Sequence, residues 1–322
     1  MTVVVTGGAG FIGSSLVRAL LAAGEQVRVL DDLSTGRRAN LDGLLGEVEL
    51  LVGDVREPAR TRRALRRAEV VYHLAALPSV ARSVAEPRAS HSVNAEGTLN
   101  LLLAARDQGV RRVVYASSSS VYGDTPVLPK HEDMPVAPRS PYAASKLAGE
   151  GYCRAFAHAF GLETVSLRFF NVFGPRQDPA SQYAAVVPRF VTRMLAGQPP
   201  QIRGDGGQTR DFTFVANAVH ACRLAAAAPA ASGEACNVGC DQRISVLDLV
   251  ELLNQLLGTA LEPVFAPPRP GDVRDSQAAI GKAERLLGYR PLVAVQAGLA
   301  RTVEWFAGVP SATPAGQGAP TP

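Results

Sequence analysis

Short apolar runs alternate with longer, helix-like segments through the first half of the chain. Apolar runs that end in polar or glycine-rich text predict strands, and the periodic segments between them predict helices. This alternation predicts an α/β fold, a Rossmann-type doubly wound parallel sheet with helices on both faces. The expected strands are Val3–Val5, Val27–Leu30, Val48–Val52, Val70–Leu74, Val113–Ala116 and Thr164–Arg168, and the expected helices are Ser14–Ala23, Glu57–Arg67, Asn94–Gln108 and Tyr142–Phe160.

The pattern changes near Asn171. Beyond it the elements become shorter, and glycine- and proline-rich text such as Gly204-Asp-Gly-Gly separates them. We therefore expect residues 1–170 to form one large lobe, to which later segments return. Residues 171–307 should form a smaller mixed α/β lobe that binds the substrate. The Ser/Thr/Pro/Gly/Ala-rich residues 308–322 lack the apolar content for a core and should be disordered.

Composition narrows the class of protein. The chain has 322 residues, 47% of them hydrophobic, and a formal net charge of +4, as is ordinary for a globular enzyme. An arginine-rich stretch from Arg56 to Arg67 has no interleaved aromatic residues. It therefore predicts a solvated helix face, and we expect no nucleic-acid partner.

Cysteine usage and the N-terminus indicate the compartment. Cys153, Cys222, Cys236 and Cys240 have no paired metal-ligand spacing, so we expect free thiols and no metal site. The sequence enters a strand directly at Thr2, without a basic leader or a long apolar run. We therefore expect a cytoplasmic protein that does not bind a membrane.

A glycine-rich turn follows the first expected strand. It contains Gly8-x-Gly10-x-x-Gly13 and the overlapping Gly7-x-x-Gly10-x-x-Gly13. Between a strand and a helix, such glycines let the backbone approach a pyrophosphate, which then lies at the helix N-terminus. The turn predicts a dinucleotide site with contacts from Gly7, Gly10, Phe11, Ile12 and Gly13.

Asp31 ends the second expected strand, 18 residues after Gly13. A carboxylate there can accept both hydroxyls of the adenosine ribose and would repel a 2′-phosphate, which favours NAD over NADP. Asp31 or Asp32 could instead only cap a turn, and nearby Arg37 and Arg38 keep NADP open. Asp54 and Val55 follow the third strand, where they can meet the adenine edge. The other residues expected to contact the cofactor are Asp32, Ser34, Thr35, Gly36, Leu74, Ala75, Ala76, Asn94 and Phe170.

Ser118, Tyr142 and Lys146 predict a redox site for a secondary alcohol. Ser140 and Pro141 suit an N-cap and a first helical position, which stacks Tyr142 and Lys146 on one helix face. A phenol acting as a base near pH 7 must lose roughly 3 units from a pKa of about 10, or about 4 kcal/mol. An ammonium about 4 Å away supplies about 4 kcal/mol at an effective dielectric near 20. Among 33 basic residues only Lys130, Lys146 and Lys282 are lysines, so a lysine at 146 stands out.

Several longer motifs carry a family resemblance that spans nearly the whole chain. They include His73-Leu-Ala-Ala-Leu-Pro-Ser-Val, Tyr115-Ala-Ser-Ser-Ser-Ser-Val-Tyr-Gly, Arg168-Phe-Phe-Asn-Val-Phe-Gly-Pro-Arg-Gln and Gly204-Asp-Gly-Gly-Gln-Thr-Arg-Asp-Phe. The chain resembles an extended short-chain dehydrogenase/reductase, most closely a nucleotide-sugar 4-epimerase of the UDP-glucose or UDP-N-acetylglucosamine type. The resemblance implies that Tyr142 takes the proton of the sugar 4-hydroxyl while hydride passes from C4 to NAD. Ser118 would bind O4, Lys146 would hold the nicotinamide ribose, and the 4-keto sugar would turn and take the hydride back.

The resemblance also implies the substrate contacts and the assembly. Asn171 would contact the sugar or the diphosphate, arginines at 210 and 269 would neutralise the diphosphate, and Asp272 would meet the uridine ribose. A homodimer would form through the helices at Asn94–Gln108 and Tyr142–Phe160. The full set of expected substrate contacts is Ser79, Ser118, Asn171, Gln177, Val187, Arg210, Arg269, Asp272 and Ser276.

Four alternatives concern the reaction and the sugar. Dehydratases and decarboxylases that resemble this family carry acidic residues just after the catalytic serine or threonine, whereas this chain has Ser119 and Ser120. A nicotinamide-sensing protein would be free to lose Tyr142 or Lys146. UDP-glucuronate 4-epimerisation stays open.

In similar epimerases one gate residue admits N-acetyl groups, and Ser276 at that position leaves room. This predicts turnover of UDP-GlcNAc/UDP-GalNAc as well as UDP-Glc/UDP-Gal.

Overall fold

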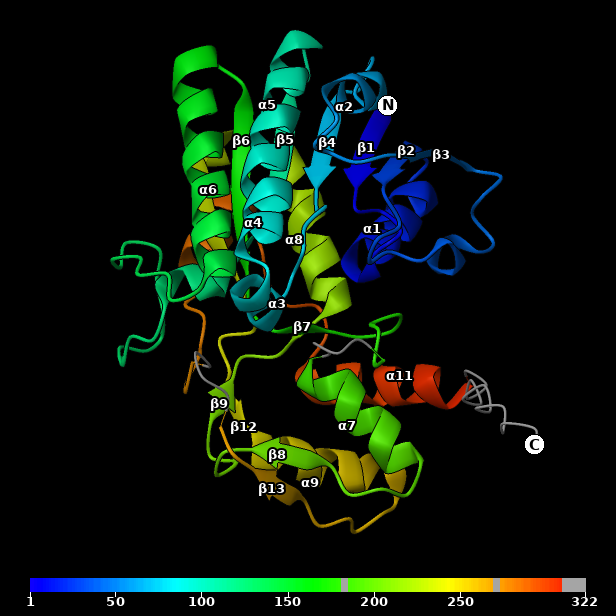
Figure 1. The fold of residues 1–322 in the computed structure, drawn as a ribbon, viewed down its shortest axis with the longest axis vertical. Helices are drawn as coiled ribbons and strands as arrows, with labels where there is room; N and C mark the ends of the chain where they lie inside the picture. The colour runs from blue at the N-terminus through cyan, green and yellow to red at the C-terminus, as the bar shows by residue number, and fades with distance from the viewer. Residues whose placement is uncertain (181–184, 269–272, 309–322) are drawn as a thin grey trace, which may run out of the picture.

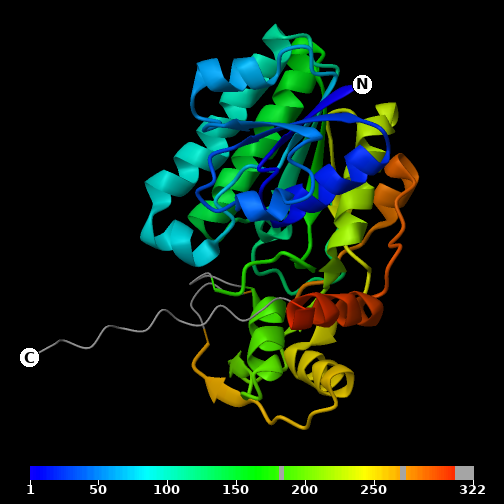
Figure 2. The same ribbon diagram turned by 90° about the vertical axis from the view of Figure 1, so that its right-hand side faces the viewer.

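The computed structural model describes residues 1–180, 185–268 and 273–308. The chain forms a large lobe around a parallel sheet and a smaller lobe, which lies below it in Figure 1. Figure 2 shows the same two lobes after a turn of 90° about the vertical axis. Arg269 and Asp272, both expected to bind substrate, lie outside the described residues. So does the expected tail after Gly308, the residue that ends the last helix.

The large lobe contains a seven-stranded sheet in the order β11-β6-β5-β4-β1-β2-β3, in which every neighbouring pair is parallel. The predicted doubly wound fold is thereby confirmed. The strand at one edge, β11, comes from residues beyond Asn171 and was not among the expected strands. The strands are β1 Thr2–Thr6, β2 Gln26–Asp31, β3 Val48–Val52, β4 Val70–His73, β5 Arg112–Ser118, β6 Glu163–Phe169 and β11 Glu234–Val238.

Helices cover both faces of this sheet. On one face α2 (Pro58–Ala64), α5 (Gly97–Asp107) and α6 (Pro141–Phe160) bury a core that includes Leu101 and Phe156. On the other face α1 (Phe11–Ala22), α8 (Val215–Ala227) and α10 (Gly281–Leu287) pack on Val3 and Val5. Removing such apolar surface from water is the main force that holds the layers together.

Short helical segments precede α5. They are α3 (Val80–Ala85), α4 (Pro87–His91) and a π-helical turn, Ser92–Glu96, so the expected helix at Asn94 begins in that turn. Single π-turns of this kind are frequent near functional sites. Three 3₁₀ segments, Arg38–Leu41, Ser119–Tyr122 and Pro229–Ala231, occur elsewhere.

The smaller lobe is built from α7 (Val186–Leu195), α9 (Val246–Leu257) and α11 (Val295–Gly308). These helices pack around buried side chains that include Phe190, Leu249 and Leu299. Among the described residues, no helix combines the length and apolar character needed to cross a membrane. Three two-stranded sheets complete the lobe and its junction: β7 Val172–Phe173 with β10 Thr213–Phe214, β9 Thr209–Arg210 with β12 Ile244–Ser245, and β8 Gln201–Arg203 with β13 Val264–Ala266.

Candidate active site

A cleft of about 990 Å³ lies between the two lobes, beyond the carboxyl ends of the sheet strands. Its floor is the point where the sheet order reverses, between β1 and β4, which is where doubly wound sheets bind ligands. Most residues predicted from the sequence meet there. The cleft is lined by Gly7, Gly10, Phe11, Ile12, Gly13, Asp31, Asp32, Ser34, Thr35, Gly36, Asp54, Val55, Leu74, Ala75, Ala76, Ser79, Ser118, Tyr142, Lys146, Asn171, Gln177, Arg210 and Ser276.

The glycine turn forms a tight cradle at one end of this cleft. Gly7 has φ +70°, and a Cβ on it would lie 2.7 Å from the backbone nitrogen of Ala75. A Cβ on Gly13 would lie 2.0 Å from the Gly7 carbonyl oxygen. Only glycine fits at both positions, and α1 begins directly after the turn. Free backbone N–H groups and the helix dipole there suit a pyrophosphate, so the residues present fit a dinucleotide.

Asp31 joins the second strand to the glycine turn. Its carboxylate accepts hydrogen bonds from the backbone N–H groups of Ala9 and Leu33, both at 2.9 Å. Burial raises the pKa of Asp31, and these two hydrogen bonds counter part of the rise. Arg37, which kept NADP open, forms an ion pair with Asp178 at 2.6 Å. A carboxylate thus faces the position expected for the ribose.

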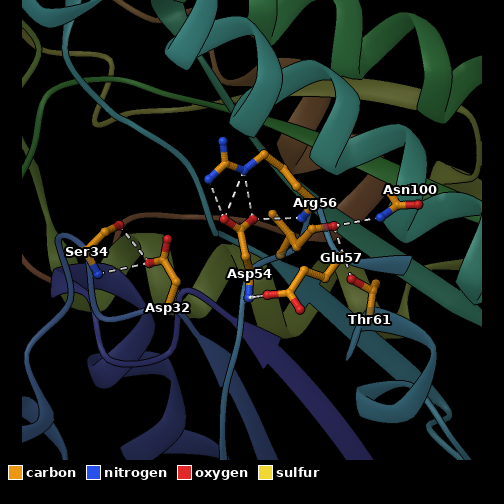
Figure 3. A network of polar contacts seen from close by, with 8 residues as sticks. Asp32, Ser34, Asp54, Arg56, Glu57, Thr61 and Asn100 are labelled. Atoms are coloured by element: carbon orange, nitrogen blue, oxygen red, sulfur yellow. Dashed lines mark hydrogen bonds and ion pairs between the residues drawn. The ribbon is translucent and has the colours of Figure 1, made fainter. Parts of the chain in front are cut away.

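The turn after β3 is held by a polar network (Figure 3). Asp54 accepts from the Nε of Arg56 at 2.9 and 3.0 Å, and this contact lowers the pKa of Asp54. The Val55 carbonyl accepts from Asn100 Nδ2 at 2.9 Å and from Thr61 Oγ1 at 3.1 Å. The segment expected to meet the adenine edge is therefore fixed from both sides before any ligand arrives.

The expected catalytic side chains come from one strand and one helix. Ser118 is the last residue of β5, and Tyr142 and Lys146 lie one turn apart near the start of α6. The Ser140 hydroxyl accepts from the Ala143 N–H at 3.1 Å, which confirms the predicted N-cap. Because β5 and α6 pack together, all three side chains reach the same wall of the cleft.

Burial dominates the electrostatics of this wall. The pKa of Tyr142 is raised above its ordinary value by burial, and a side-chain hydrogen bond with Ser118 offsets part of the rise. Burial also lowers the pKa of Lys146 to about 8. The Lys146 ammonium donates to the Ala116 carbonyl at 2.8 Å and lies 5.0 Å from the Tyr115 ring. The expected fall of the tyrosine pKa is therefore not seen in the protein without its ligands, where desolvation of the phenol is the largest influence on this pKa.

A buried polar network supports β5 and α6 from behind. Ser117 donates to Glu150 at 2.5 Å, and Glu150 pairs with Arg168 at 2.8 Å, with both side chains less than a tenth exposed. Arg168 in turn donates to the Tyr122 hydroxyl at 2.9 Å. Each charge has an opposite charge and hydrogen bonds, as burial requires. Ser117 is therefore committed to the network, whereas Ser118 faces the cleft.

The residues expected to bind the sugar line the same cleft. Asn171, with φ +31°, donates from Nδ2 to the Ser276 hydroxyl at 3.1 Å and to the Asp211 carbonyl at 3.0 Å. Ser276 is 6% exposed, has a small side chain and lines the cleft, and the region beside Asn171 and Ser276 is the sugar corner. Arg210 donates to the carbonyls of Thr209 and Arg274 at 2.8 and 2.7 Å, which brings its guanidinium to the cleft wall.

Some expected residues lie elsewhere. Asn94 is 1% exposed, accepts from the Leu77 N–H at 2.8 Å and donates to the Ser145 hydroxyl at 3.0 Å, so its amide supports the wall from behind. Phe170 and Val187 are apolar side chains that the two cores bury. Asn94, Phe170 and Val187 are not among the residues that line the cleft, and their expected ligand contacts stay predictions.

Sequence reasoning also missed residues that line the cleft. Arg176, next to the expected Gln177, has φ +68° and donates to the Ser15 hydroxyl at 3.0 Å. Trp305 reaches the cleft from α11, far along the chain, and no local sequence pattern predicts this position. Lys130 also lines the cleft. The rarity of lysine in the chain could have singled it out.

Comparisons with known proteins agree with this geometry. Residues 3–239 match the NAD dependent epimerase/dehydratase family. A UDP-glucose 4-epimerase of Mycolicibacterium smegmatis is 44% identical over 310 residues, which cover 95% of this chain and 98% of that protein.

Two solved structures superpose closely on the described fold. A UDP-glucose 4-epimerase from Thermotoga maritima, solved with UDP-glucose, has a TM-score of 0.91 and 39% identity over 95% of this chain and 98% of that one. A UDP-N-acetylglucosamine 4-epimerase from Methanobrevibacter ruminantium, in complex with UDP-N-acetylmuramic acid, has a TM-score of 0.90 and 37% identity over 95% and 97%.

Proposed function

The chain belongs to the NAD dependent epimerase/dehydratase family, and on this premise we propose that it interconverts UDP-sugars at C4 through a transient 4-keto sugar. The substrates would be the pairs UDP-Glc/UDP-Gal and UDP-GlcNAc/UDP-GalNAc. The family match and the relatives above support an enzyme of the UDP-sugar 4-epimerase kind that uses NAD.

One observation carries the proposal. Ser118, Tyr142 and Lys146 line one wall of the same cleft whose far end holds the glycine cradle and Asp31. This arrangement supports oxidation of an alcohol beside a dinucleotide. When bound, NAD supplies the hydride acceptor and a formal positive charge.

The chain's own residues would handle the proton and the orientation. Tyr142 Oη would accept the proton of the C4 hydroxyl as the C4–H bond breaks, and would return a proton to O4 when the hydride comes back. Ser118 would hold O4 by a hydrogen bond. Lys146, one turn away from Tyr142, would stabilise the phenolate, since opposite charges attract strongly in a buried site. No net oxidation occurs over the cycle.

The sugar corner supports a substrate with an N-acetyl group. Ser276 is a small residue beside Asn171, so a bulky substituent on the hexose has room there. The guanidinium of Arg210 suits phosphate oxygens, because its planar fork can donate two parallel hydrogen bonds. Dehydration of the sugar would need further proton carriers, and the positions after Ser118 are Ser119 and Ser120, whose hydroxyls are poor acids at neutral pH.

We expect a homodimer. Two helices that pack side by side, α5 and α6, carry exposed large side chains: Leu103 on α5 is 36% exposed, and Tyr152 and Phe160 on α6 are 36% and 51% exposed. Leu103→Glu combined with Phe160→Glu should convert the dimer to a monomer, measured by light scattering after size exclusion. Leu292→Glu, at an exposed leucine far from these helices, is the control. An unchanged mass for the double variant would count against this interface.

The proposed activity is tested by proton NMR of UDP-Glc and of UDP-GlcNAc, each incubated with purified protein and no added NAD. Formation of the galacto isomer from both sugars is the expected result, with the rate ratio ranking them. Conversion of UDP-Glc alone would remove the N-acetylated pair. Absence of conversion of either sugar, with NAD then added, would contradict the proposal and direct the search to UDP-glucuronate.

A further inference from the structure

Lys130 is a buried cation that the mechanism above does not use. It is one of three lysines in the chain, beside Lys146 and Lys282. Its exposed fraction is 1%, yet it lines the cleft. Lysine is almost never fully buried unless it is paired, because an ammonium loses its hydration there. A lysine at such a position therefore needs hydrogen-bond acceptors for its ammonium group.

The backbone around Lys130 is held rigidly against the sugar corner. The Lys130 N–H donates to the Gln277 carbonyl at 2.8 Å, and the Lys130 carbonyl accepts from the Ala279 N–H at 2.9 Å. It also accepts from Asn237 Nδ2 at 2.8 Å. Since Gln277 follows Ser276 directly, these bonds fix Lys130 beside the corner that Ser276 leaves open.

Within the described residues, the Lys130 ammonium has one hydrogen-bond acceptor, a backbone carbonyl. Nζ donates to the Gly123 carbonyl at 3.0 Å. An ammonium has three N–H donors, so a single carbonyl leaves donor capacity toward the cleft. The site is therefore suited to an additional oxygen ligand.

The charged groups around Lys130 define the kind of ligand. Burial lowers the pKa of Lys130, the Arg210 cation lowers it further, and the carboxylates of Asp124 and Asp275 raise it. Those carboxylates are exposed or engaged elsewhere: Asp124 pairs with Arg139 at 2.8 Å, and Asp275 accepts from the Thr209 hydroxyl at 2.6 Å. An electron-rich oxygen of a ligand would relieve the buried charge most directly.

We propose that Lys130 is a specificity-determining residue that donates a hydrogen bond to a carbonyl or carboxylate oxygen carried by the hexose, beside Ser276. This inference rests on the proposed function and deepens it by naming the substituent that the sugar corner recognises. The shared chemistry is an sp² oxygen acceptor, supplied by an N-acetyl group or by a uronate. UDP-Glc carries neither, so it serves as the reference sugar.

The test compares Lys130→Met with wild type on UDP-GlcNAc, UDP-glucuronate and UDP-Glc. The ratio of kcat/KM for a substituted sugar over that for UDP-Glc should fall roughly tenfold to a hundredfold, as expected for loss of a hydrogen bond to a charged group. The sugar whose ratio falls identifies the substituent. Lys282→Met, which removes a lysine paired with Glu234 outside the cleft, should leave both ratios unchanged.

Binding measurements separate this inference from the proposed activity. Calorimetric Kd values for UDP and the three UDP-sugars report on Lys130 even if no sugar is converted. The proposal predicts weaker binding of one substituted sugar and an unchanged Kd for UDP. Equal weakening of UDP and all sugars would assign Lys130 to the diphosphate, and equal Kd values in wild type and variant would assign it to structure. Either result overturns the proposal.

Lys130→Gln, which keeps a polar side chain, replaces the methionine variant if thermal denaturation shows that the latter does not fold.

Discussion

The Lys146 ammonium is anchored to the backbone carbonyl of Ala116 at 2.8 Å. Ala116 lies two residues before Ser118 on β5, so this bond ties the start of α6 to the end of the strand. Tyr142, one turn earlier on the same helix, is thereby held at the wall that Ser118 also reaches. A cation, a hydroxyl and a phenol meet because one strand and one helix carry all three.

The first prediction concerns the pH dependence of the reaction. Burial lowers the pKa of Lys146 to about 8. Tyr142 lies one helical turn away, so under the proposed mechanism we expect the two groups to titrate as a pair. Below this pH both groups are protonated and no base is present. One lost proton gives either phenol and amine or the reactive phenolate and ammonium. We therefore expect kcat/KM for UDP-Glc to rise with pH through a midpoint at about 8 and to level off above it.

Lys146→Met tests which group causes the rising limb of the pH–rate profile. Without the ammonium, burial raises the pKa of Tyr142 with only the Ser118 hydrogen bond in opposition. The rising limb should move above the ordinary tyrosine pKa of about 10. The pH–rate profiles of wild type and variant are the measurement. A limb at the same pH in both proteins would show that another group titrates.

The second prediction concerns the choice between NAD and NADP. Asp31→Asn removes the negative charge but keeps one acceptor oxygen for the Ala9 or Leu33 N–H. NAD binding should weaken roughly tenfold to a hundredfold, and the preference for NAD over NADP should shrink. Asp42→Asn is the matched control, because Asp42 is exposed and is not among the residues that line the cleft. The measurement is a titration of each protein with both nucleotides, and tighter binding of NADP by wild type would contradict the assignment.

The third prediction concerns the open corner at Ser276. Ser276→Tyr should fill the space beside Asn171 and suppress turnover of UDP-GlcNAc at least about tenfold more than that of UDP-Glc, since overpacking excludes the larger group. Ser232→Tyr, at an exposed turn, controls for the added ring. The measurement is the turnover rate of the wild type and of each variant on UDP-GlcNAc and on UDP-Glc. Equal loss on both would mean that Ser276 does not set the size limit.

The local motifs predicted much of the fold and the cofactor end of the cleft. Gly7 and Gly13 are constrained by their immediate neighbours along the chain and across β1 and β4, so a short pattern describes them. The cap at Ser140 is likewise local. The constraints at Gly13 and Ser140 arise within a few residues along the chain, whereas Gly7 also meets Ala75 beyond β4.

Features that depend on distant packing were not predictable in the same way. β11 joins the sheet only because it pairs with β6, and Trp305 reaches the cleft only because α11 packs below it. The Tyr142 pKa is a second example. The estimate from sequence counted the attraction of Lys146 but not the burial of the phenol, and the latter depends on every element around the cleft.

The most direct measurement of the central claim is the epimerisation of UDP-Glc by the wild-type protein in D₂O, followed by proton NMR at C4 of the product. Hydride that leaves C4 and returns to it keeps the original hydrogen, so UDP-Gal should carry no deuterium at C4. Tyr142→Phe should slow the reaction at least about a hundredfold, whereas Tyr152→Phe, on the exposed side of the same helix, should not. Deuterium at C4 of the product would contradict the account.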